Sequence, residues 1–280
     1  MGAIIWLASY PKSGNTWMRA FLHNLLTNAK EPVALDKLAQ FCLGESNAVP
    51  YSVRANKPIN ELTEEDVVKY RPIVHRDFTR ASPDSVFVKT HNYLGTWFDQ
   101  PIHTMEVTAG AIYIVRNPLD VVLSVRHHFS LSLDEAIERM GTIGMGTAFA
   151  DGHIPEIHST WSHNVESWTG EPSPQKLVLR YEDLLGEPQK YFRQTCQFLG
   201  LNPPLERLDR AIRFSSFKVL KEQEEQKGFE ERPKNASANF FREGRAEQWR
   251  EELTPDQVRK IISDHGEQMK RFGYIPADYA

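Results

Sequence analysis

Apolar residues gather in four short runs along the chain, and each run is bounded by polar or turn-forming residues. Runs of four or five residues with little alternation are typical of strands that are buried on both faces of a parallel sheet. We therefore predict strands at Ile4–Ala8, Val86–Lys89, Ala111–Val115 and Leu177–Arg180.

The segments between these runs carry helix signals. Residues 15–26 place their large apolar side chains on one helical stripe. Capping boxes begin at Thr63 (T-x-x-D) and at Thr254 (T-x-x-Q), and Pro118 suits a first helical position, where its missing N–H costs nothing. The predicted helices are Asn15–Leu26, Thr63 to about Val74, a segment from Pro118, Tyr191–Leu199, Leu205–Phe214, and Thr254 to about Phe272.

Strands that alternate with helices predict one α/β domain over residues 1–280, with a central parallel sheet flanked by helices. Such sheets bind ligands at the carboxyl ends of their strands. Two segments are predicted to be mobile, glycine-rich Gly141–Gly152 and charged Glu222–Asn239. Either segment is a plain surface loop or an active-site lid, and the sequence leaves both interpretations open.

Composition excludes several classes of protein. The 280 residues are 40% hydrophobic and 25% charged, which is the composition of a globular chain. A net charge of −4 argues against a nucleic-acid partner. Two cysteines indicate no disulfide framework and favour a reducing cytoplasm, and no apolar stretch is long enough to predict a membrane span.

Residues 9–17, Ser-Tyr-Pro-Lys-Ser-Gly-Asn-Thr-Trp, connect the first predicted strand to a helix. A turn of this kind forms an anion site, because backbone N–H groups and the positive helix end converge there. Lys12 adds a charge and Thr16 a hydroxyl. The spacing differs from the ATP- or GTP-binding P-loop, since the lysine precedes the glycine. The alternative is a purely structural turn.

Two other strands end in candidate ligand-binding residues. Arg116 follows the third run, and Ser124 lies two helical turns later, so that the two side chains suit a second phosphate group. The alternative for Arg116 is a structural pair with Asp120. The second run ends in Lys89-Thr90-His91, where His91 is a candidate general base and Lys89 leaves the strand on the same face. A lone histidine is otherwise more often structural.

Together these segments make the sequence resemble the sulfotransferases that use 3′-phosphoadenosine 5′-phosphosulfate (PAPS). Residues 10–17 resemble the 5′-phosphosulfate loop of that family, residues 112–124 its 3′-phosphate segment, and residues 89–91 its catalytic Lys-Thr-His. Tyr181-Glu182-Asp183 and Ser216-Phe217 resemble its later Y-E-D and S-F elements. The resemblance spans roughly residues 4–272, and the motifs occur in the family's order.

The resemblance implies transfer of a sulfuryl group from PAPS to a hydroxyl or amine of a small-molecule acceptor, leaving adenosine 3′,5′-bisphosphate. His91 would take the acceptor's proton, Lys12 would neutralise the bridging oxygen, and Lys89 would hold the sulfuryl oxygens. Trp17 and Phe217 would sandwich the adenine, although Trp17 suits core packing as well. The residues implied for donor binding are Lys12, Ser13, Gly14, Asn15, Thr16, Trp17, Arg116, Ser124, Tyr181, Ser216, Phe217, Arg242 and Gly244.

The sequence departs from the family pattern in two places. The R-K-G that contacts the 3′-phosphate reads Arg242-Glu243-Gly244, so that either Arg242 or Arg245 has to supply the charge. The dimer motif of the cytosolic animal enzymes is also broken, because the matching positions are Arg250, Thr254, Pro255 and Arg259. A homodimer stays open. The compactness of the chain and Asn15 in the phosphosulfate loop make it resemble a bacterial enzyme more than an animal one.

The acceptor is not defined by the motifs. Histidines at 127, 128, 153, 158 and 163 are expected to line the acceptor pocket, to be solvated or to be structural, and no metal site is predicted. An apolar or aromatic acceptor pocket is suggested by aromatic residues in the segments around the core, which serve equally well as packing. These residues are Phe41, Tyr51, Phe78, Tyr93, Trp97, Phe98, Phe129 and Phe149.

Three other functions compete with this interpretation. A small-molecule or nucleotide kinase would share the sheet and the phosphate turn, but the lysine placement disfavours it. A non-catalytic nucleotide-binding module is weakened by the presence of Lys12 and His91 together. A dehydratase that uses sulfonation only as activation would differ in its product.

Overall fold

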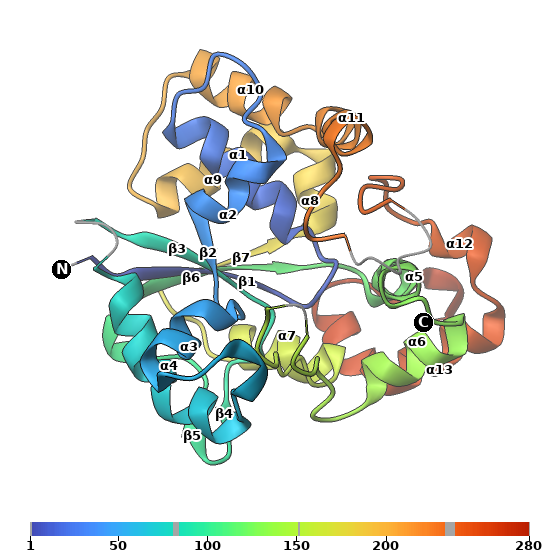
Figure 1. The fold of residues 1–280 in the computed structure, drawn as a ribbon. Helices are drawn as coiled ribbons and strands as arrows, with labels where there is room; N and C mark the ends of the chain where they lie inside the picture. Colours follow the sequence, from blue (N-terminus) through green and yellow to red (C-terminus); the bar gives the residue numbers. More distant parts are fainter. Residues whose placement is uncertain (1, 81–83, 151, 233–238, 280) are drawn as a thin grey trace.

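The computed structural model describes residues 2–80, 84–150, 152–232 and 239–279. Its main sheet has five parallel strands in the order β2-β3-β1-β6-β7 (Figure 1). The strands are β1 (Ile4–Ser9), β2 (Cys42–Gly44), β3 (Val86–Thr90), β6 (Thr108–Val115) and β7 (Lys176–Arg180). All four predicted strands are confirmed. The edge strand β2 was not predicted, because three residues carry too little periodicity to read.

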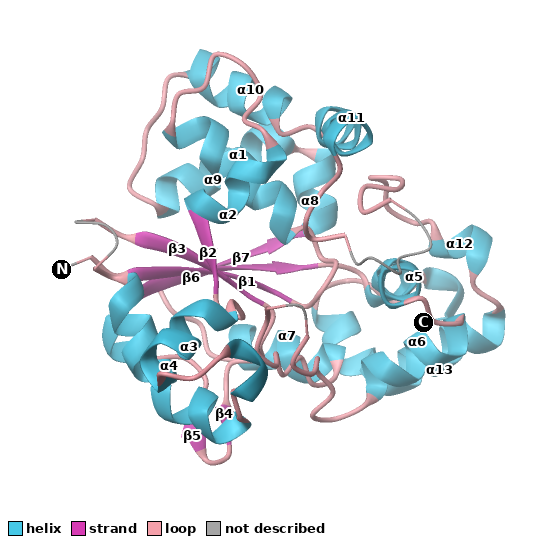
Figure 2. Cartoon of the chain, in the orientation of Figure 1, coloured by secondary structure: helices cyan, strands magenta, loops and turns pink. Residues whose placement is uncertain are grey.

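Helices cover both faces of this sheet, as predicted (Figure 2). Successive residues of β1 point to opposite faces of the sheet: Trp6 packs into one core cluster and Leu7 into the other. The layer drawn above the sheet in Figure 1 contains α1 (Asn15–Leu26), α2 (Leu38–Phe41), α8 (Tyr181–Gly186), α9 (Pro188–Phe198), α10 (Leu205–Phe214) and α11 (Phe217–Lys227).

The remaining helices lie below the sheet and beyond its carboxyl-terminal edge (Figure 1). They are α3 (Ala48–Ala55), α4 (Glu64–Phe78), α5 (Pro118–Phe129), α6 (Leu133–Gly141), α7 (Trp161–Thr169), α12 (Trp249–Glu252) and α13 (Pro255–Arg271). A two-stranded antiparallel hairpin, β4 (Thr96–Trp97) and β5 (Gln100–Pro101), extends from this lower layer. The described residues include no helix that is both long and apolar enough to cross a bilayer.

The capping signals located the helix starts well. Thr63 and Thr254 both form complete capping boxes, and α1 and α10 have the predicted bounds. Helix α4 runs past the predicted Val74 to Phe78, because His75 and Phe78 continue its buried face despite Pro72 inside it. Cys42 and Cys196 are both buried and free, so they form no disulfide.

Parts of the two segments predicted to be mobile are held by helix or by backbone hydrogen bonds, and residue 151 lies outside the described residues. Residues 222–227 belong to α11, whose Leu220 and Glu224 are buried. Glu224 accepts hydrogen bonds from the backbone N–H groups of Phe240 and Phe241, which ties α11 to the chain beyond it. Residues 233–238 lie outside the described residues. The glycine-rich segment after α6 is tethered by backbone bonds, among them Ala48 N–H to Gly152 O at 2.9 Å.

Candidate active site

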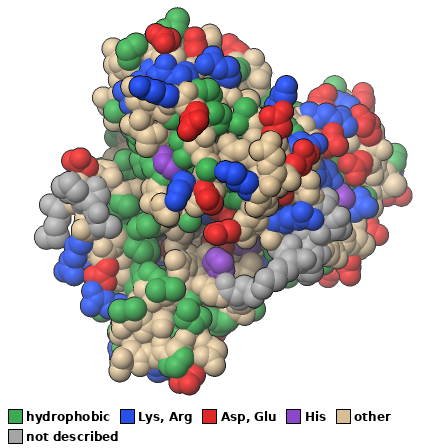
Figure 3. Space-filling view, turned by 45° about the horizontal axis from the view of Figure 1, so that its top comes forward, with side chains coloured by type: hydrophobic (Ala, Val, Ile, Leu, Met, Phe, Trp, Pro, Cys, Tyr) green, Lys and Arg blue, Asp and Glu red, His purple; other side chains and the backbone are tan. Residues whose placement is uncertain are grey.

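A cavity of about 900 Å³ opens at the carboxyl ends of the strands. On the face drawn in Figure 3, charged side chains and histidines gather around a hollow between the upper and lower layers. Every donor-binding or catalytic residue implied by the sequence lines this cavity except Ser13. The lining members are Lys12, Gly14, Asn15, Thr16, Trp17, Lys89, His91, Arg116, Ser124, Tyr181, Ser216, Phe217, Arg242 and Gly244.

The turn between β1 and α1 is shaped for close approach. Gly14 has φ +109°, and a Cβ there would lie 2.8 Å from the Tyr181 ring, so that only glycine fits. Lys12 also adopts a left-handed conformation, with φ +67°. A lysine held in this sparsely populated region is typical of a functional turn. The side-chain nitrogen of Asn15 is engaged by the strand rather than by the cavity, since Nδ2 donates to Leu7 O at 2.8 Å.

Ser13 is the one implied residue that does not line the cavity. Its side chain is buried, and its Oγ has no hydrogen-bond partner in the described part of the chain. Arg19, one turn further along α1, was missed by the sequence analysis. It is buried and donates to Thr16 Oγ1 at 2.9 Å and to the Glu231 carboxylate at 2.7 Å. The only available signal was its spacing of three residues from Thr16 on the same helix.

Lys12 is enclosed at the centre of the cavity. Its Nζ lies 3.4 Å from the centroid of the Phe240 ring. Burial lowers the pKa of Lys12, and the charges of Lys89 and Arg116 lower it further, to about 7, in spite of Glu231 nearby. The ammonium group is therefore poorly compensated by the protein, and an anionic ligand would supply the missing charge.

Arg116 lies against the same turn. One guanidinium nitrogen donates to Lys12 O at 3.1 Å, and the group stacks 4.4 Å from the Tyr181 ring centroid. Its Nε is buried and has no partner in the described residues. Asp120 instead accepts from the backbone N–H groups of Glu247 (2.7 Å) and Trp249 (3.1 Å). The structural alternative, in which Arg116 pairs with Asp120, is therefore not found.

The segment around Gly244 completes this end of the cavity. A Cβ on Gly244, whose φ is +64°, would lie 2.2 Å from the Phe217 ring.

Trp17 is half-buried and packs edge-on against Tyr181 and Phe192, so it serves the core and the cavity wall at once. Arg242 lines the cavity, whereas Arg245 is turned to Glu251 at 2.8 Å and to Glu243 at 3.4 Å.

His91 ends β3 on the opposite wall. Its Nδ1 lies 2.8 Å from Ser9 O, and because a carbonyl oxygen only accepts, Nδ1 carries the proton and Nε2 is the free acceptor. Burial, together with the charge of Lys89, lowers the pKa of His91 to about 3, so the ring is neutral. Lys89 lines the cavity as well, with its Nζ 3.6 Å from Glu231.

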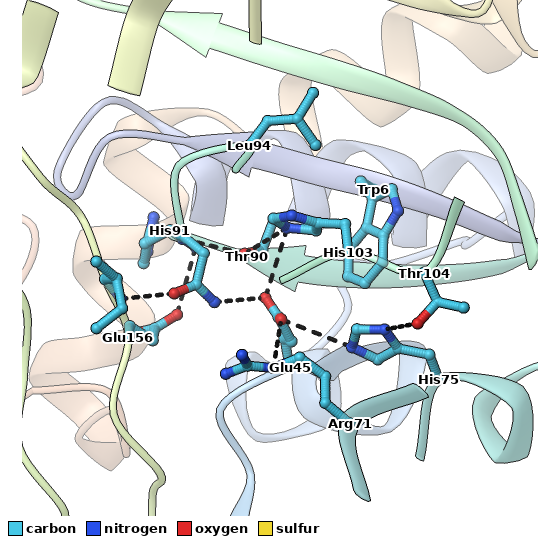
Figure 4. Close-up of polar contacts among 12 residues, drawn as sticks. Trp6, Glu45, Arg71, His75, Thr90, His91, Leu94, His103, Thr104 and Glu156 are labelled. Atoms are coloured by element: carbon cyan, nitrogen blue, oxygen red, sulfur yellow. Dashed lines mark hydrogen bonds and ion pairs between the residues drawn. The ribbon is translucent and has the colours of Figure 1, made fainter. Parts of the chain in front are cut away.

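A buried polar network holds the chain beside His91 (Figure 4). Asn92 donates to Glu45 Oε2 at 2.8 Å and accepts from Ile157 N–H at 2.6 Å. Glu45 is fully buried, and Arg71 Nε lies 3.7 Å from its carboxylate. Burial opposes ionisation of Glu45, but His103, His75 and Arg71 outweigh burial and hold the pKa of its carboxyl well below the ordinary value.

We expect Glu45→Ala to lower the free energy of unfolding by about 3–5 kcal/mol, because it leaves the buried Arg71 charge unpaired. Urea denaturation at neutral pH measures this loss. The exposed Glu138→Ala on α6 is the matched control and should change stability by less than about 0.5 kcal/mol. A loss at Glu45 no larger than the control would show that the network contributes nothing to stability.

The acceptor side of the cavity differs from the expected aromatic pocket. Of the eight aromatic residues considered, only Phe129 lines the cavity. Tyr51 and Phe78 are buried in the core below the sheet, and Phe98 is 60% exposed. The wall is instead made by Ser46, Phe129, Thr147, Ala148, Ala150, His153, Glu156 and His158, which we call the acceptor wall.

The histidines divide between this wall and other roles. His127 and His128 line the cavity near the donor residues, and burial lowers their pKa values to about 4 and about 3. His163 does not line it; its Nδ1 lies 2.8 Å from Ser159 Oγ. In the described ranges, no group of three or more His, Cys, Asp or Glu side chains is placed to hold a metal ion.

Comparison with known proteins identifies the family. The family model described as a sulfotransferase domain matches residues 4–273. Among curated relatives, cytosolic sulfotransferase 1 of Arabidopsis thaliana is 27% identical over 277 residues, which cover 94% of this chain and 78% of that protein. The 3-beta-hydroxysteroid sulfotransferase of Cavia porcellus is 30% identical over 173 residues, which cover 60% of this chain and 58% of that protein.

Solved structures show the same fold. Retinol dehydratase in a complex with retinol and PAP has a TM-score of 0.65 at 18% identity, covering 95% of this chain and 81% of its own. Mouse sulfotransferase SULT7A1 complexed with PAP has a TM-score of 0.62 at 20% identity, covering 96% of this chain and 85% of its own. The chain belongs to the sulfotransferase family. It is a sulfotransferase, an enzyme that moves a sulfuryl group from a donor to an acceptor.

Proposed function

We propose that this sulfotransferase transfers the sulfuryl group of PAPS to a hydroxyl group of a small molecule, with His91 as the general base. The observation that carries the proposal is the arrangement of charge in one cavity. Lys12 and Lys89 lie at the turn after β1 and at the end of β3, and Arg116 and Arg242 line the same cavity from the chain before α5 and from the chain before α12. Four cationic side chains around one cavity suit a donor that has both a 5′-phosphosulfate and a 3′-phosphate.

The neutral imidazole of His91 suits proton removal. The acceptor O–H gives its proton to Nε2, an S–O bond forms to the acceptor oxygen, and the S–O bond to the 5′-phosphate breaks. Lys12 stabilises the charge that develops on the leaving phosphate oxygen, and Lys89 holds the sulfuryl oxygens. Positioning in line supplies much of the remaining rate, as in phosphoryl transfer.

The other lining residues suit the rest of the donor. Thr16 and the N–H groups at the start of α1 bind the 5′-phosphate, while Arg116, Ser124 and Arg242 bind the 3′-phosphate. The unpartnered Nε of Arg116 supports this role, because a buried donor without an acceptor is costly until a ligand supplies one. The aromatic rings of Trp17 and Phe217, with Tyr181 and Ser216 beside them, enclose the adenine.

A hydroxyl acceptor is favoured by the names of the relatives, which include hydroxysteroid and flavonol sulfotransferases. We further propose that the enzyme acts in the cytoplasm, in keeping with relatives named as cytosolic. One family match over residues 4–273 supports a single domain. Homodimerisation also stays a prediction, and the broken dimer motif at Arg250 and Arg259 argues for another interface if a dimer forms.

The donor assignment predicts that adenosine 3′,5′-bisphosphate binds at least tenfold more tightly than ATP, because ATP offers no 3′-phosphate to Arg116 and Arg242. Isothermal titration of both nucleotides measures the two affinities. Equal affinities would contradict the assignment and favour a kinase-like site.

Proton uptake should accompany this binding above neutral pH. Because the pKa of Lys12 in the free enzyme is about 7, bisphosphate binding to the protonated amine requires no proton at lower pH and takes one up at higher pH. The Kd should therefore rise by up to about tenfold per pH unit above that pKa. Titrations near pH 8 in two buffers of different ionisation enthalpy measure the uptake, and Lys12→Met should abolish it. Uptake that persists in Lys12→Met would assign the proton to another group.

A further inference from the structure

Glu156 reaches the cavity on a rigid support. The residues before and after it form antiparallel bridges, Gly146 to Ile157 and Asn47 to His153. Thr147 N–H donates to Glu156 O at 2.9 Å, and Ile154 N–H donates to Ser46 O at 2.8 Å. A side chain on such a doubly bridged segment is held in place before any ligand arrives.

The Glu156 carboxylate lies beside the reacting end of the cavity. Its Oε1 accepts from the backbone N–H of His91 at 3.3 Å, and its Oε2 lies 4.0 Å from His158 Nε2 (Figure 4 shows Glu156 beside His91). The side chain is only 12% exposed. Burial alone would raise the pKa of Glu156, but the contact with His158 and the positive charge of Lys89 outweigh burial and lower it to about 2, so the group is ionised.

In the part of the chain that the structure describes, no lysine or arginine contacts this carboxylate, and its nearest basic side chain is His158 at 4.0 Å. None of the described residues of the acceptor wall is a lysine or arginine. Lys89, whose charge reaches Glu156 through space, makes its contact with Glu231 at 3.6 Å on the donor side. The ring of His91 is neutral.

Other buried carboxylates of the chain differ from Glu156. Glu45 has Arg71 and Asn92 beside it, and Glu231 has two contacts of 2.7 Å with Arg19. An ionised carboxylate that is buried without a fully charged cation beside it is costly. A ligand that brings a positive charge would remove that cost, whereas a neutral apolar ligand would increase it by excluding water.

We propose that Glu156 selects an acceptor that carries a cationic group, such as a protonated amine, close to the hydroxyl that is sulfated. This inference rests on the proposed function and names the acceptor class of the same site. The ammonium group donates to the Glu156 carboxylate while the hydroxyl lies at His91 Nε2. The polar acceptor wall suits such a molecule better than it suits the apolar acceptors named for the relatives.

The test uses pairs of acceptors that differ only in charge. Phenols that carry an aminoalkyl chain of increasing length are compared with phenols that carry an uncharged alkyl chain of the same length, with PAPS as donor. For at least one length, wild-type enzyme should favour the charged member by roughly 10- to 100-fold in kcat/KM, the range expected for one charge-assisted hydrogen bond.

Glu156→Gln should bring this ratio close to one, because glutamine keeps an oxygen for the His91 N–H but loses the charge. Glu243→Gln is the matched control: it removes another carboxylate from the wall of the same cavity, at the donor end, and should leave the ratio unchanged. Bisphosphate affinity, measured in parallel, reports whether either variant disturbs the donor site.

A wild-type ratio near one, or a preference that survives in Glu156→Gln, would overturn the inference. Failure of the proposed function gives a different result: neither member of any pair is sulfated, and PAPS does not bind. If PAPS binds but none of these phenols is sulfated, the test is the equilibrium binding of the phenols to the complex of enzyme and bisphosphate. Charged members must then bind more tightly than uncharged ones, and any other outcome contradicts the inference.

Discussion

His91→Asn abolishes sulfuryl transfer but leaves the affinity for adenosine 3′,5′-bisphosphate within a few-fold of wild type. The expected loss in turnover is on the order of 10²- to 10⁴-fold, the contribution of a positioned general base. Asparagine keeps an N–H that can donate to Ser9 O, so the loop after β3 stays in place while the basic nitrogen is lost. Steady-state turnover and isothermal titration on the same variant measure both quantities.

Thermal stability provides the control for this variant. A histidine that only packed the core would, when replaced, lower the melting temperature and weaken every ligand together. Retained turnover with a normal melting temperature would mean that the base lies elsewhere. The next candidates would be His127 and His128, which line the same cavity.

Arg116→Ala should weaken binding of adenosine 3′,5′-bisphosphate by about 2–5 kcal/mol, or roughly 30- to 5,000-fold in Kd. The guanidinium is buried beside the donor turn, so that removing it leaves the 3′-phosphate without a desolvated charge partner. Titration with the bisphosphate and with adenosine 5′-monophosphate measures the loss with and without that phosphate.

The comparison of the two nucleotides separates a direct contact from general damage to the turn. Adenosine 5′-monophosphate should lose much less affinity, since Arg116 reaches the 5′-phosphate turn through a hydrogen bond to the backbone oxygen of Lys12. The bisphosphate affinity of Arg116→Lys should fall between those of wild type and Arg116→Ala, because lysine keeps the charge but lacks the planar guanidinium group that binds phosphate through two N–H groups. Equal losses for both nucleotides would assign Arg116 a structural role.

The donor half of the cavity could be predicted because its residues lie in contiguous motifs. The turn at residues 10–17 carries its own glycine, its lysine and the start of α1, so that sequence spacing alone places them together. Arg116 and His91 each follow a buried strand, and parallel strands bring such residues to one edge of the sheet.

His153 and His158 were among the candidates for the acceptor pocket and do line it, but the rest of the acceptor half could not be predicted, because no local pattern joins its residues. Ser46 follows an edge strand of three residues, while Thr147 and Glu156 come from a bridged segment without helix or strand periodicity.

Of the aromatic residues that suggested an apolar pocket, Tyr51 and Phe78 belong to the core, and only Phe129 lines the cavity. Periodicity indicates that a side chain is buried, but it does not distinguish a core from a cavity wall.

Helix α11 was missed for a related reason. Its sequence, FKVLKEQEEQK, is rich in charged residues, and only Leu220 and Glu224 are buried. Glu224 is retained inside because two backbone N–H groups, those of Phe240 and Phe241, satisfy its carboxylate. Such a partner comes from a distant segment, so that the sequence near Glu224 carries no sign of it.

Sulfuryl transfer by this enzyme is tested most directly by measuring both products of one incubation with PAPS and a phenolic amine. Mass spectrometry of a single sample measures the adenosine 3′,5′-bisphosphate released and the acceptor that has gained one SO₃ unit. In wild-type enzyme the two amounts should rise together, one for one, and in His91→Asn both should nearly vanish. Bisphosphate released with free sulfate, or an acceptor that has lost water rather than gained SO₃, would contradict sulfuryl transfer to the acceptor.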